Sequence, residues 1–200
     1  MLLVLNRLWG VGWPLSRLLT LGLEIGADVP FFLAGRNAFV EGIGDRLTPV
    51  SVPAQWLAVL KPAAGLATRA VFASPLLVRD TEAVIVESLS GRASQGTRFP
   101  AGQSPEPLGP WGIAGLLGGF GRNDLQGAAQ AQCDEVARAA GMLEAQFGNS
   151  RMTGSGSAVF ARAGSDAQPS TALPAPLPEG WVGRMCRSLE HHPLLGWACD

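Results

Sequence analysis

The spacing of apolar residues along this chain predicts a series of helices. Leucines and other apolar side chains recur every three or four positions, which places them on one face of a helix. Glycine directly follows three of these runs, as is typical of helix ends. The pattern predicts helices over residues 2–9, 15–25, 68–74, 82–89 and 125–147.

Shorter apolar runs bounded by glycine, proline or asparagine predict strands between these helices. They cover residues 37–41, 56–60, 157–162 and 181–189, and a turn is expected over 42–45 after the first of them. A stretch rich in Gly, Pro, Ser and Gln, residues 91–121, predicts a long loop. Because helices and strands interleave, the predicted class is mixed α and β.

Composition restricts the classes of function. The 200 residues are 47% apolar and 16% charged with a net charge of −1, which is typical of a globular protein. We expect no membrane partner, since neither a long apolar run nor a signal peptide is seen. We expect no nucleic-acid partner, since there is no basic cluster. Cys133, Cys186 and Cys199 lack metal-ligand spacing, so we expect reduced thiols, no protein-held metal and a cytoplasmic location. The oligomeric state is not indicated.

Asp28 is the first candidate for chemistry. It is the one carboxylate in an uncharged, mostly apolar segment, GADVPFF at residues 26–32. A carboxylate held there would lie against a packed wall with little water around it, and could serve as a general base toward a substrate hydroxyl. The alternative is a turn or helix-capping aspartate, and the local sequence alone favours it, because Asp-Val-Pro is good turn chemistry.

The segment Thr153-Gly154-Ser155-Gly156-Ser157 is the second candidate. Two glycines let the backbone approach a ligand closely, and successive N–H groups with nearby hydroxyls can bind an anion. The alternative is a connection that merely needs positive φ, and the run is neither a Walker motif nor a dinucleotide fingerprint. A carboxylate and a Gly/Ser loop together suggest phosphoryl transfer.

Two further segments have weaker signals. Thr68 and Phe72 lie one helical turn apart and could line a pocket with a hydroxyl and a ring. The alternative, favoured locally, is that Thr68 is the N-cap and Phe72 a core aromatic. His191 and His192 have no carboxylate or cysteine at metal-ligand spacing and are expected at the surface.

Together these segments resemble the 4-diphosphocytidyl-2-C-methyl-D-erythritol kinase family of the GHMP kinases. The order and approximate spacing match over nearly the whole chain, and the Gly- and Pro-rich loop is the least similar part. The matching segments are residues 23–32, 39–50, 68–72, 79–81, 123–125, 151–161 and 192–194. The first two segments favour this family over galactokinase, homoserine kinase and mevalonate kinase, whereas the Gly/Ser loop is common to the superfamily.

The resemblance implies an α+β fold of two domains. Residues 1–50 would be the tail of an incomplete N-terminal nucleotide-binding domain, of the ribosomal S5 domain 2-like type. Residues 51–200 would be the C-terminal GHMP kinase domain. It also implies that ATP, accompanied by Mg²⁺, phosphorylates the 2-hydroxyl of 4-diphosphocytidyl-2-C-methyl-D-erythritol in non-mevalonate isoprenoid biosynthesis.

The same resemblance implies roles for individual residues. Asp28 would be the catalytic aspartate, and Ile43, Thr68 and Phe72 would lie near the substrate. The loop residues near the phosphates would be Thr153, Gly154, Ser155 and Gly156.

The start of the chain departs from the family pattern. The family begins with β structure that carries an active-site lysine, followed by a glycine- and serine-rich phosphate loop that leads into a helix. Residues 1–10 match the later part of that helix, and Lys61 is the only lysine of the chain. We therefore expect an N-terminally shortened chain that binds ATP poorly and has little kinase activity by itself. The alternatives are a non-catalytic remnant with a substrate-binding or interaction surface, and another GHMP small-molecule kinase.

Overall fold

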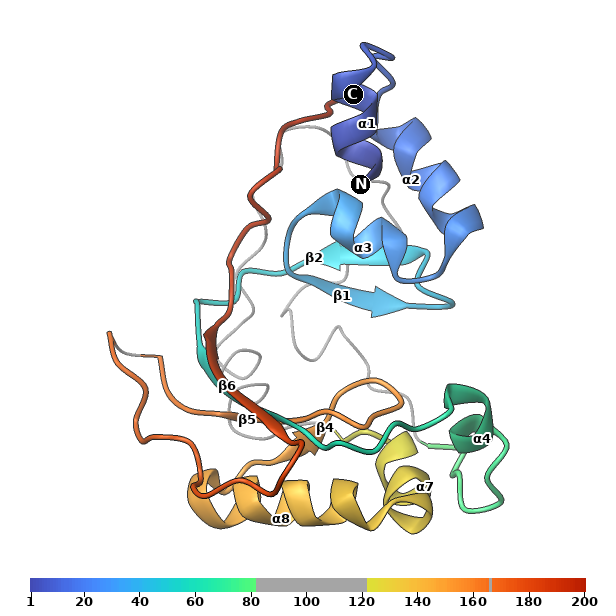
Figure 1. Ribbon diagram of the computed structural model, residues 1–200. Helices are drawn as coiled ribbons and strands as arrows, with labels where there is room; N and C mark the ends of the chain where they lie inside the picture. Colours follow the sequence, from blue (N-terminus) through green and yellow to red (C-terminus); the bar gives the residue numbers. More distant parts are fainter. Residues whose placement is uncertain (82–121, 166) are drawn as a thin grey trace. The chain divides into compact units, whose positions relative to one another are not determined.

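The computed structural model describes residues 1–81, 122–165 and 167–200 of the chain. These residues form two compact units (Figure 1). Unit 1 contains Met1–Pro53 and Leu189–Asp200, and the described part of unit 2 contains residues 54–81, 122–165 and 167–188. The predicted helix over 82–89 and the predicted loop over 91–121 lie outside the described residues.

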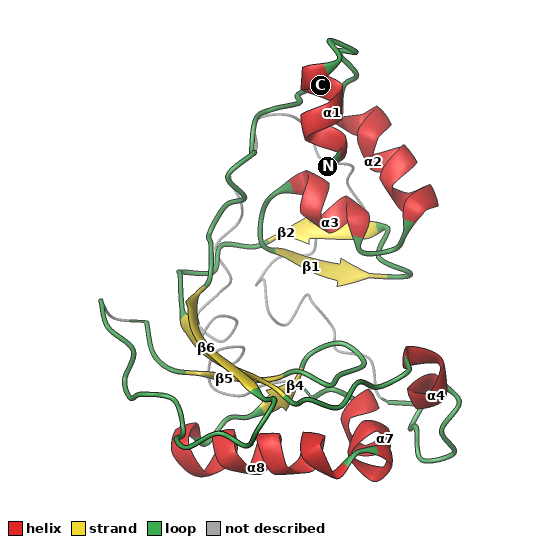
Figure 2. Cartoon of the chain, viewed as in Figure 1, coloured by secondary structure: helices red, strands yellow, loops and turns green. Residues whose placement is uncertain are grey.

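Unit 1 consists of helices followed by a two-stranded antiparallel ribbon (Figure 2). Its elements are α1 (Leu2–Leu8), α2 (Leu15–Ile25), α3 (Val29–Ala34), β1 (Ala38–Glu41) and β2 (Arg46–Pro49). Helices α1 and α2 and strand β1 confirm the predictions made from the apolar spacing. The register pairs Ala38 with Pro49 and Glu41 with Arg46, so the expected turn over 42–45 closes a hairpin.

The core of unit 1 takes one buried leucine from each helix: Leu3, Leu18 and Leu33. Helices α2 and α3 pack closely at Gly22. A Cβ atom added to Gly22 would lie 2.7 Å from the Leu33 side chain, so only glycine leaves room for this contact. The buried amide of Asn6 joins α1 to the link that precedes α2. Its Nδ2 donates to the Trp13 carbonyl (3.0 Å), and its Oδ1 accepts the Trp13 N–H (2.9 Å). This small core holds the start of α3, where Asp28 lies.

The last twelve residues of the chain belong to unit 1, and Figure 1 shows the C-terminus beside α1. The His192 N–H donates to the Gly35 carbonyl (2.8 Å), and Leu194 and Ala198 pack on the leucine core. The first compact unit ends at Pro53 and resumes at Leu189, and these contacts join residues 189–200 to its helices. The domain boundaries expected from the resemblance stay a prediction. His191 is exposed as expected, but His192 is half-buried.

Unit 2 is an antiparallel sheet with helices on one face (Figure 1). Its strand order is β4-β5-β3-β6. Its elements are β3 (Trp56–Lys61), α4 (Thr68–Phe72), α7 (Leu125–Gln132), α8 (Asp134–Phe147), β4 (Arg151–Met152), β5 (Val159–Arg162) and β6 (Val182–Arg187). Alternate residues of the central strands, such as Leu60 and Val159, are buried together with Val136 and Leu143 of α8. The predicted mixed α+β class is confirmed.

Several local predictions need correction. The helix expected over 125–147 is two helices, because Cys133 has an extended backbone (φ −151°, ψ 102°). The buried face of α8 consists of Val136, Ala139, Ala140 and Leu143. The strand expected from residue 157 begins at Val159, since the preceding residues belong to the Gly/Ser loop. Strands β2 and β4, and helix α3 in place of a turn, were not predicted.

Candidate active-site residues

Asp28 is the N-cap residue of α3, but its side chain makes no capping hydrogen bond. The side chain is exposed, so the expected wall with little water is wrong. The reason is its place at the helix end, since the buried side of α3 comes from Pro30, Leu33 and Ala34. Among the described residues, no hydrogen bond or ion pair engages the Asp28 carboxylate. Its oxygens are therefore free to accept a hydrogen bond from a hydroxyl.

The turn between β1 and β2 lies against the residue that precedes Asp28. Gly44 has φ +103°, and a Cβ atom added there would collide with the backbone carbonyl of Ala27. Ile43, next to it in the turn, is 72% exposed. Its N–H donates to Asp45 Oδ1 (3.1 Å), which fixes the turn. Unit 1 thus presents an exposed apolar side chain on a turn that touches the segment of the free carboxylate.

The Gly/Ser loop connects β4 to β5 in unit 2 and is closed by its own backbone. The Thr153 N–H donates to the Ala158 carbonyl and the Gly156 N–H donates to the Thr153 carbonyl, both at 3.0 Å. Gly154 (φ +55°) and Gly156 (φ +88°) have the left-handed backbone that favours glycine. Within the described part of the chain, the N–H groups of Gly154 and Ser155 make no hydrogen bond. The loop therefore offers two neighbouring donors, as an anion site requires.

Helix α4 contributes a hydroxyl to this loop. Thr68 Oγ1 lies 2.8 Å from Ser155 Oγ, at hydrogen-bond distance. The prediction that Thr68 is the N-cap is wrong, because Ala67 is the N-cap and the Thr68 hydroxyl contacts the loop instead. Phe72, one turn along α4, is 48% exposed, so it is not a core aromatic. The structure thus brings Thr68 to Ser155 and leaves the Phe72 ring open on the same helix.

Ser157 is a structural residue of the loop that the sequence did not single out. Its side chain is 5% exposed, and its Oγ donates to the Ala64 carbonyl (2.7 Å) in the segment that follows β3. The sequence held no signal for this role, because local sequence does not show which serine of a Gly/Ser run is buried in the folded protein.

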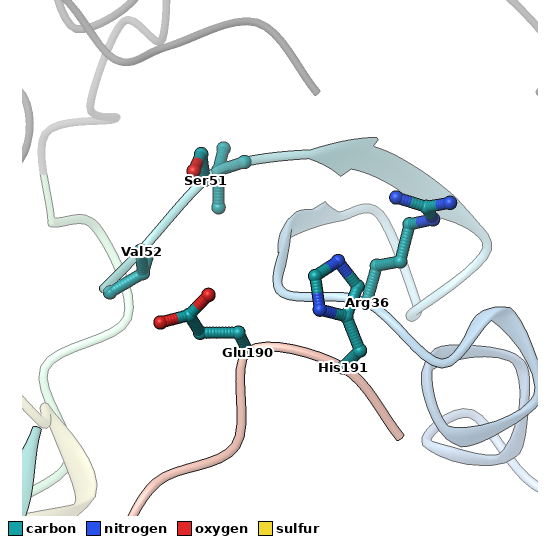
Figure 3. A pocket seen from close by; sticks show the side chains of 6 residues that line it. Arg36, Ser51, Val52, Glu190 and His191 are labelled. Carbon is teal, nitrogen blue, oxygen red and sulfur yellow. The ribbon is translucent and has the colours of Figure 1, made fainter. Parts of the chain in front are cut away.

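Two hollows of the described surface are lined by residues other than the candidates. A pocket of about 30 Å³ in unit 1 lies between the segment of Ser51 and Val52 and the segment of Glu190 and His191 (Figure 3), and holds about one water molecule. An open polar groove of about 540 Å³ in unit 2 is lined by α7 and by the link from α8 to β4. In the ranges that the structure describes, no three His, Cys, Asp or Glu side chains gather as metal ligands. None of the described helices is both long and apolar enough to cross a bilayer.

The fold is that of a GHMP-type small-molecule kinase. A solved structure with a similar backbone is the crystal structure of 4-(cytidine 5'-diphospho)-2C-methyl-D-erythritol kinase, at a TM-score of 0.57 and 28% sequence identity. The match covers 81% of this chain and 52% of that chain. No protein-family model matches the sequence.

The curated relatives that this chain resembles share one name. The chain is 50% identical over 199 residues to 4-diphosphocytidyl-2-C-methyl-D-erythritol kinase of Methylibium petroleiphilum. It is 45% identical over 197 residues to the kinase of that name from Variovorax paradoxus, and 44% identical over 196 residues to that of a Polaromonas species. Each match covers 98% of this chain.

The chain is therefore a homologue of the 4-diphosphocytidyl-2-C-methyl-D-erythritol kinases, which confirms the resemblance found in the sequence motifs. It spans 61%, 63% and 56% of the lengths of the Methylibium, Variovorax and Polaromonas relatives.

Proposed function

We propose that this chain supplies active-site residues for the reaction after which its relatives are named, ATP-dependent phosphorylation of the 2-hydroxyl of 4-diphosphocytidyl-2-C-methyl-D-erythritol, and does not by itself carry out the whole reaction efficiently. The reaction would serve non-mevalonate isoprenoid biosynthesis in the cytoplasm. The observation that carries the proposal is the free carboxylate of Asp28, which stands in a chain 50% identical to a kinase of this name.

Asp28 would accept or orient the proton of the 2-hydroxyl as this oxygen attacks the γ-phosphate. A general base must lie within hydrogen-bond reach of the proton, and it needs an oxygen that is not already occupied. The Asp28 carboxylate meets the second condition, since its side chain caps nothing and pairs with nothing among the described residues. A base of this kind contributes roughly 10²–10⁴ in rate.

The Gly/Ser loop would bind phosphate oxygens. Phosphoryl transfer depends chiefly on positioning and on stabilising negative charge, so preorganised donors account for much of the catalysis. The N–H groups of Gly154 and Ser155 and the hydroxyl pair of Thr68 and Ser155 supply such donors. The exposed side chains of Ile43 and Phe72 would contact apolar surface of the substrate.

Mg²⁺ would accompany the phosphates of ATP. The described residues do not fit a protein-held metal, because no three potential ligands lie together among them. We therefore derive no step through the metal, and assign to this chain only the positioning of the hydroxyl and of phosphate oxygens.

A graft tests the proposal directly. Residues 1–200 replace the matching segment of the Methylibium petroleiphilum relative, and ADP release is measured with 4-diphosphocytidyl-2-C-methyl-D-erythritol, homoserine and mevalonate in turn. We expect turnover with the first compound alone, and ³¹P NMR of the product should place the new phosphate on the 2-hydroxyl. The unmodified relative is the control. A folded graft without turnover, or one that prefers homoserine or mevalonate, would contradict the proposal.

A further inference from the structure

The side chain of Asn123 joins the start of α7 to the Gly/Ser loop. Its Nδ2 donates to two carbonyls of the loop, those of Met152 (2.8 Å) and Gly154 (2.7 Å). Its Oδ1 accepts the N–H of Leu125 (3.0 Å), the first residue of α7. Both amide hydrogens and the oxygen are thus used, and the two carbonyls fix which end of the amide is nitrogen.

The bond to Gly154 has a consequence for the next residue. The Gly154–Ser155 peptide bond is trans, and in a trans peptide the C=O and the N–H point in opposite directions. Because Asn123 holds the Gly154 carbonyl toward its own amide, the Ser155 N–H points in the opposite direction, away from Asn123. That N–H is one of the two loop donors without a hydrogen bond among the described residues.

A neighbouring residue of α7 holds the strand that leads into the loop. Gln126 Oε1 accepts the N–H of Met152 (2.9 Å), so this residue is held at its N–H by Gln126 and at its C=O by Asn123. Residue 124 is held in turn, since Asp124 accepts from Thr81 Oγ1 and pairs with Arg122, both at 2.7 Å. The start of α7 is therefore a fixed base from which Asn123 can orient the loop.

We propose that Asn123 is a positioning residue that orients the Ser155 N–H toward a phosphate group of the ligand. The identity of the ligand, a nucleoside triphosphate, rests on the proposed function. The geometry of the loop does not depend on it. Asn123 acts through the peptide of Gly154 and Ser155 and does not itself bind the phosphate.

The Asn123→Asp variant separates the hydrogen bond to α7 from the hydrogen bonds to the loop. It has nearly the same shape and keeps an acceptor for the Leu125 N–H, but it sets a carboxylate oxygen against the two loop carbonyls. Asn149→Asp is the matched control. Asn149 also donates twice, to the Phe147 carbonyl (2.7 Å) and the Arg162 carbonyl (3.2 Å), and accepts once, from the Arg162 N–H (2.6 Å). These bonds lie at the end of α8 and on β5, outside the Gly/Ser loop.

Two readouts on the full chain distinguish positioning from stability. The first is hydrogen exchange at the bonded amides of Thr153 and Gly156, and the second is the Kd for ATP and for inorganic triphosphate. We expect Asn123→Asp to accelerate exchange at both amides and to weaken binding about tenfold relative to Asn149→Asp, with a similar loss of Tm in both. Asn123→Ser keeps an uncharged acceptor near the Leu125 N–H but removes both donors to the loop, and should give the same pattern if the aspartate variant fails to fold.

The outcomes separate this inference from the proposed function. Equal effects of the Asn123 and Asn149 variants on loop exchange would overturn the positioning role. Faster loop exchange in the Asn123 variants alone supports it, even if the wild-type chain binds neither ATP nor triphosphate. In that case the phosphate-binding role of the loop fails, while the control of its shape by Asn123 stands.

Discussion

Gly156 determines how closely the Gly/Ser loop packs on its surroundings. Its φ of +88° is strained for any residue with a side chain, and an added Cβ atom would lie 2.8 Å from Met152 Sδ and 3.1 Å from Leu66 Cδ1. Met152 is 1% exposed, so it has little room to move away. The glycine is therefore required by both conformation and space, which the Gly/Ser composition alone did not distinguish.

We predict that Gly156→Ala lowers the free energy of unfolding by about 1–3 kcal/mol, because both strain and overpacking oppose the new methyl group. Urea denaturation of the full chain measures the effect. Gly141→Ala is the control, since Gly141 is a helical residue of α8 with nothing within 4 Å of an added Cβ. That change should be neutral or stabilising by up to about 1 kcal/mol. Equal losses in the two variants would refute the role given to Gly156.

Thr68 shows that the contact of a single side chain is harder to predict than the side of the helix on which the residue lies. Helical spacing correctly placed Thr68 and Phe72 on one side of α4, but it did not predict that this side is exposed. The partner of the Thr68 hydroxyl, Ser155, is 87 positions away in the chain, and local sequence holds no information on such a contact. The sequence likewise suggested that apolar neighbours shield Asp28. In the structure only Pro30 of residues 26–32 is buried, and Phe32 is 61% exposed, so these neighbours form no closed wall around the carboxylate.

Helix α2 receives its N-terminal cap from the far end of the chain. Its N-cap residue, Pro14, has no side-chain acceptor, and the Ser16 N–H donates instead to Asp200 Oδ1 (2.8 Å). The backbone N–H of Ser16 lowers the pKa of Asp200 below its ordinary value of 3.8, the Ser16 hydroxyl adds to this, and burial opposes it. Because the folded-state pKa is depressed, the carboxylate stabilises the fold above the unfolded pKa. This contribution is lost as the pH falls through the folded pKa.

Replacing Asp200 with alanine should therefore lower Tm at pH 6, and the difference from wild type should shrink as the pH falls below about 4. Thermal unfolding by circular dichroism between pH 2 and pH 7 measures this. Glu179→Ala, an exposed change in unit 2, is the control and should leave Tm almost unchanged at all these values. A constant Tm difference across the pH range would show that the Asp200 carboxylate does not cap α2.

Among helices and strands, those with a strong apolar pattern were predicted correctly, and those with few apolar residues were missed. Helix α2 and strand β3 follow from their apolar runs alone. Strand β2 has only Leu47 as a buried residue and forms because β1 supplies its hydrogen-bond partners. The break at Cys133 was hidden, since the apolar spacing continues across it into α8. Helix α3 is too short for apolar periodicity to reveal, although a proline in its first turn is typical of a helix start.

The organisation of the whole molecule could not be predicted from local pattern. The return of residues 189–200 to unit 1 depends on the His192–Gly35 and Ser16–Asp200 hydrogen bonds, which join segments more than 150 positions apart. The candidate site residues lie on both units, with Asp28 and Ile43 on unit 1 and Thr68, Phe72 and the Gly/Ser loop on unit 2. Only the family resemblance connected Asp28 with a substrate hydroxyl, and its catalytic role stays a prediction.

The central claim is that Asp28 is the catalytic carboxylate of a 4-diphosphocytidyl-2-C-methyl-D-erythritol kinase. It is tested by turnover of the graft in the Methylibium relative with and without Asp28→Asn. Glu24→Gln, which removes an exposed carboxylate from α2, is the control. We predict that Asp28→Asn lowers kcat by roughly 10²–10⁴ with Tm unchanged, since the side chain is exposed and makes no capping bond, while Glu24→Gln keeps near-normal turnover. Near-normal turnover of Asp28→Asn would contradict the account.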